Sequence, residues 1–163
     1  MTTLYSSSSK TDIAALLEAV TTNPSDPTLG QMVTRPQWEV LSSYMQATSL
    51  VPGQILIQQG AEDRNLFFVE SGMLTVHFED VTGKIRLATV GSGSVVGEGG
   101  FFSYKARSAT VQAGNACKLW ALTPMRFSEL SNRHPLVALA LAMALGAIMA
   151  KRVASNRKRI AVT

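Results

Sequence analysis

The sequence contains a single cysteine, few charged residues and no apolar run long enough to cross a bilayer. Its one cysteine, Cys117, excludes an internal disulfide and fits a reducing compartment. Charged residues make up 16% of the chain and hydrophobic residues 46%, which excludes a disordered, highly charged polymer. The longest apolar run, residues 136–150, has 15 residues, whereas a membrane span needs about 17–25. We therefore expect one globular domain of 163 residues, with this run as a helix buried in protein.

Histidine is also scarce, which argues against a metal centre. The two histidines, His77 and His134, are far apart in the sequence and belong to no cluster of carboxylates or thiols. Zinc and iron sites normally need three or four such ligands at close spacing. No nucleophile–base pair is apparent either, so we expect no metal and no catalytic residue. A small β-roll enzyme is the weakest of the alternatives.

The net charge of +4 is concentrated near one end of the chain. Lys151, Arg152 and residues 157–159 carry five positive charges, so the rest of the chain has a net charge of −1. We interpret these residues as a solvated helix end, with contact to acidic lipid or nucleic acid as the alternative. We expect no sequence-specific DNA binding, since the charge does not spread over a face. Residues 1–10 are polar and lack the apolar stretch of a secretory signal, which predicts a disordered N-terminus and a cytoplasmic protein.

Residues 11–49 are predicted to form an N-terminal helical segment. Apolar side chains recur at helical spacing in residues 12–21. Thr34–Gln37 is a capping box with proline in the first turn, which predicts a second helix that runs to about Met45. Residues 23–30, between these helices, are rich in turn-forming residues and predict a linker.

From residue 50 to residue 123 the pattern changes to short β-rich runs separated by glycines. The predicted strands are residues 54–59, 66–71, 73–80, 85–90, 106–113 and 118–122. Residues 81–84 predict a tight hairpin, and closely spaced strands of this kind are typical of a small barrel or sandwich. Residues 124–163 then predict a short helix and a long C-terminal helix, because Thr123-Pro124 and His134-Pro135 are helix-start signals.

The glycine-rich segment Gly97–Thr110 carries the chemistry. Its candidate residues are Gly97, Glu98, Gly99, Gly100 and Phe101, followed by Arg107, Ser108 and Ala109. Gly99 and Gly100 would let backbone N–H groups approach a phosphate, and Arg107 can donate two parallel hydrogen bonds to its oxygens. Glu98 cannot bind phosphate but accepts well from a sugar hydroxyl. The segment therefore predicts a sugar-phosphate site, with a surface ion pair of Arg107, or an Arg107–Glu98 pair in the empty protein, as the alternatives.

Three motifs, in this order, resemble those of the cyclic nucleotide-binding domain family, which includes the bacterial catabolite activator protein and the regulatory subunits of protein kinase A. Residues 51–60 resemble the family's first strands, residues 66–72 its next strand and turn, and residues 97–110 its phosphate-binding cassette. The similarity spans roughly residues 50–153. It implies an α+β fold in which a β-roll (a double-stranded β-helix or jelly roll) carries N-terminal helices and a long C-terminal helix.

The resemblance also implies ligand-binding roles for individual residues. Arg107 would pair with the cyclic phosphate, Glu98 would hold the ribose 2′-hydroxyl, and backbone groups at Gly99, Gly100 and Ser108 would complete the clamp. The candidate base pocket lies under the long helix, and its residues are Val76, Leu87, Val90 and Arg152.

The identity of the ligand follows less directly from the resemblance. Ser108 matches a serine of the bacterial activator, which favours cAMP, although a hydroxyl here also suits cGMP. Arg152 could stack on a purine or read guanine, so a cyclic dinucleotide is a further candidate. A degenerate scaffold that binds no nucleotide and acts through protein contacts is the remaining alternative.

The resemblance implies a regulatory module, not an enzyme, that signals to an effector protein by moving its long helix. Residues 136–150 are apolar on all sides, so this helix needs cover on both faces. A stripe of small residues spaced by four would let two such helices approach: Ala138, Ala142, Gly146 and Ala150. We therefore expect a homodimer through paired long helices, with a core helix in a monomer as the alternative.

Overall fold

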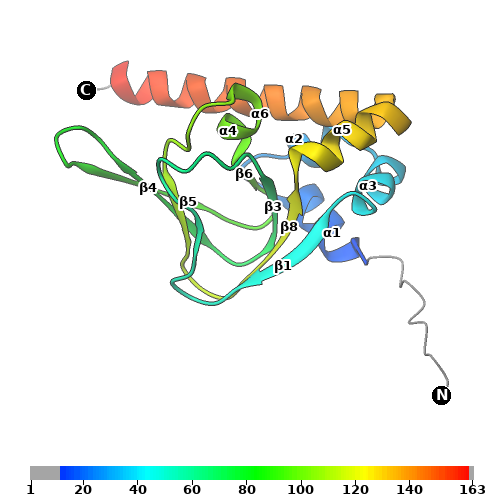
Figure 1. Ribbon diagram of the computed structural model, residues 1–163, viewed down its shortest axis with the longest axis horizontal. Helices are drawn as coiled ribbons and strands as arrows, with labels where there is room; N and C mark the ends of the chain where they lie inside the picture. Colours follow the sequence, from blue (N-terminus) through cyan, green and yellow to red (C-terminus); the bar gives the residue numbers. More distant parts are fainter. Residues whose placement is uncertain (1–11, 162–163) are drawn as a thin grey trace.

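The computed structural model describes residues 12–161 as a β-roll covered on one side by helices (Figure 1). The helices are α1 (Ala14–Thr22), α2 (Thr28–Met32), α3 (Arg35–Ser42), α4 (Glu98–Ser103), α5 (Pro124–Arg133) and α6 (Pro135–Ala161). The strands are β1 (Gln46–Leu50), β2 (Ile55–Ile57), β3 (Leu66–Ser71), β4 (Leu74–Glu79), β5 (Ile85–Val90), β6 (Val95–Val96), β7 (Thr110–Ala113) and β8 (Cys117–Leu122). This confirms the α+β roll with N-terminal helices and a long C-terminal helix. The disorder expected for residues 1–10 lies outside the described residues.

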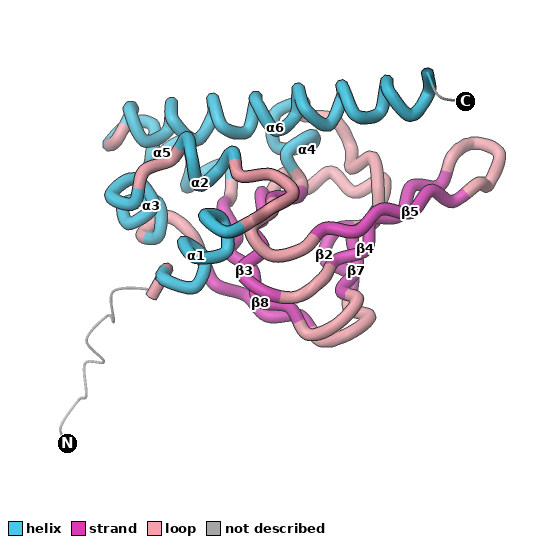
Figure 2. Tube along the Cα trace, turned by 180° about the vertical axis from the view of Figure 1, so that it is seen from behind, coloured by secondary structure: helices cyan, strands magenta, loops and turns pink. Residues whose placement is uncertain are grey.

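The strands form two antiparallel sheets, and the helices form a third layer (Figure 2). The first sheet has the order β1-β8-β3-β6 and the second the order β2-β7-β4-β5. One hydrophobic core lies between the two sheets, and the other lies between the first sheet and the helices. Strand β3 serves both, because Phe67 and Val69 belong to the first core and Leu66 and Phe68 to the second. Burial on both faces explains why the first four residues of β3, 66–69, are all apolar and do not alternate with polar ones.

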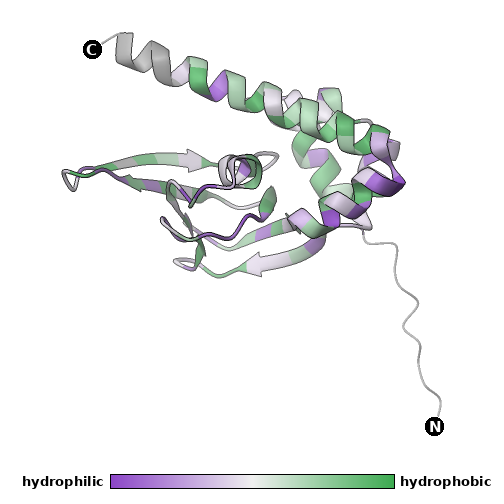
Figure 3. Cartoon of the chain, turned by 45° about the horizontal axis from the view of Figure 1, so that its top comes forward, coloured by the Kyte–Doolittle hydropathy of each residue, from purple (hydrophilic) through white to green (hydrophobic). Residues whose placement is uncertain are grey.

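Helix α6 packs along α2 and α5 and extends past the cassette helix α4 (Figures 1 and 3). The uninterrupted apolar run has 15 residues, but residues 135–155 taken together are apolar enough to cross a membrane by length and composition, unlike the expectation from the run alone, with a mean hydropathy of 1.9. The face of α6 that packs on the protein is buried, with Val137, Ala138, Leu141, Ala144, Leu145 and Ile148. Helix α6 therefore packs into the protein core along one face, while its other face is exposed. Ala138, from the expected small-residue stripe, belongs to that buried face.

The N-terminal region differs from expectation at its junction with the roll. The capping box is confirmed, since Thr34 N–H donates to Gln37 Oε1 at 2.9 Å and Gln37 N–H to Thr34 Oγ1 at 3.4 Å. Helix α3 ends at Ser42, however, where the sequence predicted a helix to about Met45, and the roll begins with β1 at Gln46. β1 has no clear β pattern of its own and acquires its conformation by pairing with β8.

Candidate functional site

Gly97 links strand β6 to the cassette helix α4, and the backbone here requires glycine. Its φ is +88°, and a Cβ would lie 2.7 Å from the Asn65 carbonyl oxygen and 2.8 Å from Arg107 Nη1. At Gly100 a Cβ would lie 3.0 Å from Arg107 Nη1, whereas at Gly99 it would meet open space. Gly97 and Gly100 thus make room for the arginine side chain itself, a reason that the sequence did not suggest.

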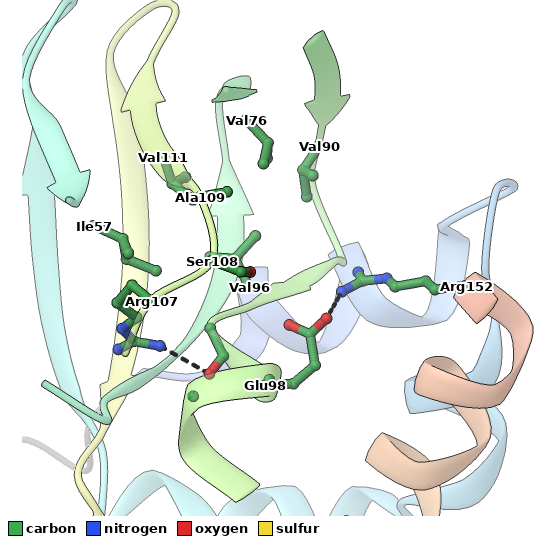
Figure 4. Close-up of a pocket in the computed structure, with 13 residues that line it drawn as sticks. Ile57, Val76, Val90, Val96, Glu98, Arg107, Ser108, Ala109, Val111 and Arg152 are labelled. Atoms are coloured by element: carbon green, nitrogen blue, oxygen red, sulfur yellow. Dashed lines mark hydrogen bonds and ion pairs between the residues drawn. The ribbon is translucent and has the colours of Figure 1, made fainter. Parts of the chain in front are cut away.

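A cavity of about 170 Å³ opens beside α4, between the second sheet and α6 (Figure 4). Ten of the twelve candidate residues line it, namely Val76, Val90, Gly97, Glu98, Gly99, Gly100, Arg107, Ser108, Ala109 and Arg152. Three apolar residues that the sequence analysis did not single out complete the wall: Ile57, Val96 and Val111. The cavity therefore has one apolar wall and a polar edge formed by α4, Arg107 and α6.

Two candidate residues, Leu87 and Phe101, do not line the cavity. Leu87 is 69% exposed, because successive side chains of a strand point to opposite faces and Leu87 lies three residues from the lining residue Val90. Phe101 is buried in the helical core, where its ring packs edge-on against Phe127 at 5.3 Å between centroids. Phe101 thus anchors α4 from behind, and Leu87 lies on the outer face of the second sheet.

Arg107 is held inside the protein by four hydrogen bonds and is only 4% exposed. Its Nε and Nη2 donate to the two carboxylate oxygens of Asp63 at 3.3 and 2.6 Å. Nη1 donates to the Gly97 carbonyl at 2.9 Å, and Nη2 also donates to the Asn65 carbonyl at 2.6 Å. Within the described residues these bonds use four of the five N–H groups, leaving one on Nη1. The guanidinium is therefore fixed in place at the cavity with one donor free for an anion.

Asp63 is the charged partner of Arg107 at the site, and sequence reasoning missed it. The hydrogen bond from Arg107 holds the pKa of the Asp63 carboxyl below its usual value, against the opposing effect of partial burial. The pair therefore stays ionised at neutral pH. Asp63 lies 44 residues before Arg107, in the loop between β2 and β3, and no local pattern marks it as a partner.

Glu98 pairs with Arg152 of α6, not with Arg107 (Figure 4). Arg152 Nη1 donates to Glu98 Oε1, and Arg152 Nη2 donates to the Val95 carbonyl at 2.8 Å. The neighbouring Lys151 Nζ donates to Thr28 Oγ1 at 2.6 Å. Two consecutive residues of α6 thus tie the helix to the cassette and to the N-terminal helices.

This arrangement suits a ligand that is anionic at one end and apolar at the other. Arg107 presents a buried positive charge, Glu98 presents an acceptor on the first turn of α4, and Val76 and Val90 present an apolar surface. A charge-assisted bond is strong at a site that excludes water, so a phosphate is the anion best matched to Arg107.

Comparison with known proteins gives a family match over the roll and cassette. The family model described as the cyclic nucleotide-binding domain matches residues 47–134. Glutaminase 2 of Bradyrhizobium diazoefficiens is 36% identical over 107 residues, which are 65% of this chain but only 16% of that protein. The matched region is thus a small part of a much longer relative.

Solved structures resemble most of the chain. A cyclic nucleotide-binding domain from Methylobacillus flagellatus has a TM-score of 0.80 at 21% identity, covering 93% of this chain and 83% of that one. The catabolite activator protein of Thermus thermophilus has a TM-score of 0.70 at 26% identity, covering 84% of this chain and 62% of that one.

Proposed function

Because the chain belongs to the cyclic nucleotide-binding domain family, we propose that it is a cytoplasmic regulatory module that binds a cyclic nucleotide, with cAMP as the first candidate. The observation that carries the proposal is the meeting of Arg107 and Glu98 at one cavity with an apolar wall. Glu98 lies in the first turn of α4 and Arg107 in the loop between α4 and β7, and both line the space that a sugar phosphate would fill.

In the proposed complex each part of the nucleotide has a matching surface. The cyclic phosphate accepts from the free Nη1–H of Arg107 and from backbone groups at Gly99, Gly100 and Ser108. The ribose 2′-hydroxyl donates to Glu98, whose Oε1 is already held by Arg152. The base lies against the apolar wall of the cavity, which includes Val76 and Val90.

The preference for cAMP rests on Ser108, which lines the cavity and matches a serine of the bacterial activator. For cGMP the same serine hydroxyl would serve, so cGMP is the next candidate. A cyclic dinucleotide would need Arg152 to read guanine, and Arg152 would first have to leave Glu98 and the Val95 carbonyl. That requirement ranks the dinucleotide third.

Calorimetric titration with cAMP, cGMP and cyclic di-GMP tests the proposal. We expect cAMP to bind most tightly, and 5′-AMP to bind much more weakly because its open phosphate does not match the cassette. Binding of none of the three cyclic ligands would overturn the proposed function. The result would then favour the non-binding scaffold, an alternative supported by the four inward bonds that Arg107 already makes.

The proposed signal passes from the cassette to α6 through the Glu98–Arg152 ion pair. A ribose that binds Glu98 changes the partners available to Arg152, and a ligand shifts a helix equilibrium only through such differences in contact. In Arg152→Ala, we expect ligand binding to lose its effect on hydrogen exchange in residues 146–155, while the effect on the cassette remains. An unchanged response of α6 would rule out this route to the effector protein.

The proposed homodimer uses the exposed face of α6. Six apolar residues on this face have alternating spacings of three and four: Leu136, Leu139, Met143, Gly146, Ala150 and Val153. This heptad spacing suits a second copy of the same helix, because it places a continuous apolar seam opposite itself across a two-fold axis. Exposure of so long a seam would otherwise be costly in water.

A charge in the middle of the seam should separate the two copies. In Met143→Glu, two carboxylates would face an apolar interface. We therefore expect the dissociation constant of the dimer to rise more than about a hundredfold. Met125→Glu is the matched control, since Met125 is 73% exposed on α5, away from the seam. Light scattering at micromolar concentrations would measure both variants. A monomeric wild type would contradict the dimer.

A further inference from the structure

Two consecutive residues of the loop between β2 and β3 contact the cassette at two places. Asp63 binds the guanidinium of Arg107, as described above. Arg64 contacts the last turn of α4, where its Nη2 donates to the Phe101 carbonyl at 2.8 Å and its Cζ lies 3.5 Å from the ring centroid of Tyr104. The Arg64 Nε is buried and has no hydrogen-bond partner among the described residues. Arg64 therefore makes these two contacts while leaving one buried N–H group without a hydrogen bond, which is unfavourable.

Tyr104 ends helix α4 in a conformation that tyrosine rarely adopts. Its φ is +59°, and it is the one non-glycine residue with positive φ in the described part of the chain. A left-handed residue at this position normally is glycine or asparagine, because a side chain is disfavoured there. Tyr104 is 78% exposed, so burial in the core does not explain the choice of a large ring. The close stacking of Arg64 on that ring does explain it.

Helix α4 has only six residues and cannot be stable by itself. Its first residues, Glu98, Gly99 and Gly100, line the cavity, while its last turn carries the contacts with Arg64. Whatever holds the last turn therefore sets the direction in which the first turn presents its groups to the ligand.

We propose that Arg64 is a positioning residue for the nucleotide site, acting through the Phe101 carbonyl and the Tyr104 ring to keep α4 in its ligand-ready orientation. This inference rests on the proposed function and adds a residue that does not touch the ligand. The inference also explains why a tyrosine stands at this strained position: its ring is the surface on which Arg64 stacks.

The first test measures hydrogen exchange in the ligand-free protein. We expect Arg64→Gln to speed exchange of amides 98–104 about tenfold, because it removes a charge-assisted bond and a cation–π contact. Arg35→Gln is the matched control, since Arg35 is 75% exposed and pairs only at the surface with Glu39. Equal cassette exchange in both variants would overturn the inference without using any nucleotide.

The second test measures binding of cAMP and of adenosine, which lacks the phosphate. Arg64→Gln should weaken cAMP about tenfold or more and adenosine clearly less, because adenosine keeps the ribose contact with Glu98 but makes no phosphate contacts with α4; a general loss of stability would weaken both alike. Wild-type protein that binds neither would overturn the proposed function as well. If the wild type and Arg64→Gln bind cAMP with equal affinity, only the proposed role of Arg64 is overturned.

Two variants of Tyr104 separate stacking from backbone strain. Tyr104→Phe keeps the ring and should match the wild type in exchange and in binding. Tyr104→Gly suits the positive φ but removes the stacking surface, and we expect it to weaken cAMP as Arg64→Gln does. Tighter binding in Tyr104→Gly would mean that strain, not stacking, governs the cassette, and would overturn the proposal.

Discussion

Arg107→Ala is expected to lower the affinity for a cyclic nucleotide more than a hundredfold, which corresponds to a loss of roughly 3–5 kcal/mol for a broken buried ion pair. The free Nη1–H and the positive charge both disappear, and the phosphate is left in a cavity without a cationic partner. The variant should also lose about 1–3 kcal/mol of stability, because the carbonyl oxygens of Gly97 and Asn65 lose their donor. Asp63 contributes less to that loss, since its side chain is 44% exposed and can turn to water.

Calorimetry and thermal unfolding of the same samples separate the two effects of Arg107→Ala. Arg107→Lys keeps the charge but cannot make the two-pronged contact with Asp63, so its affinity should fall between those of Arg107→Ala and the wild type. Arg35→Ala removes an exposed arginine that pairs with Glu39 at the surface. It should change the free energies of nucleotide binding and of unfolding by no more than a surface ion pair contributes, about 0–1 kcal/mol. Undiminished nucleotide binding in Arg107→Ala would refute the assignment of the anion site.

Gly97→Ala is expected to disrupt the cassette even though it adds only a methyl group. At φ +88° an alanine is disfavoured by about 1–2 kcal/mol, and overpacking adds about 1–3 kcal/mol. The new Cβ would lie 2.7 Å from the Asn65 carbonyl and 2.8 Å from Arg107 Nη1, so Arg107 must move. We therefore expect a lower midpoint of thermal unfolding together with a loss of nucleotide affinity.

Gly99→Ala is the matched control for Gly97→Ala, two positions along the same cassette. No atom lies within 4 Å of its ideal Cβ, and the residue is helical in α4. Alanine in a helix is favoured over glycine by about 0.5–1 kcal/mol, so the unfolding midpoint should hold or rise. Equal destabilisation by both alanines would mean that the close packing around Gly97 is not what requires glycine.

Local patterns predicted those elements whose signals lie within a few residues. β3 and β5 have the predicted bounds, and the proline start signals of α5 and α6 are borne out. The elements that the sequence analysis missed are short or lack a pattern. β1 and the two-residue β6 are strands because they pair with β8 and β3, respectively, and α2 lies in a stretch whose composition is typical of a linker.

The candidate site was predictable to the extent that its residues are neighbours in the sequence. The glycines, Glu98 and Arg107 lie within one short segment, and all of them line the cavity. Leu87 could have been rejected from strand parity alone, since it cannot share a face with Val90. The partners Asp63 and Arg152 could not be assigned by pattern, because each reaches its contact across the fold from a distant part of the chain.

The amino-acid order by itself determined the helix starts, the short strands and the glycine turns, because these signals act over a few residues; the resemblance of its motifs to a family implied the roll and the cassette. The tertiary structure decided which charges pair: Arg107 with Asp63, and Glu98 with Arg152. It also decided that one face of α6 is core and the other an exposed seam. Ion pairing and burial depend on distances between segments remote in sequence, and those distances exist only once the sheets and helices have packed together.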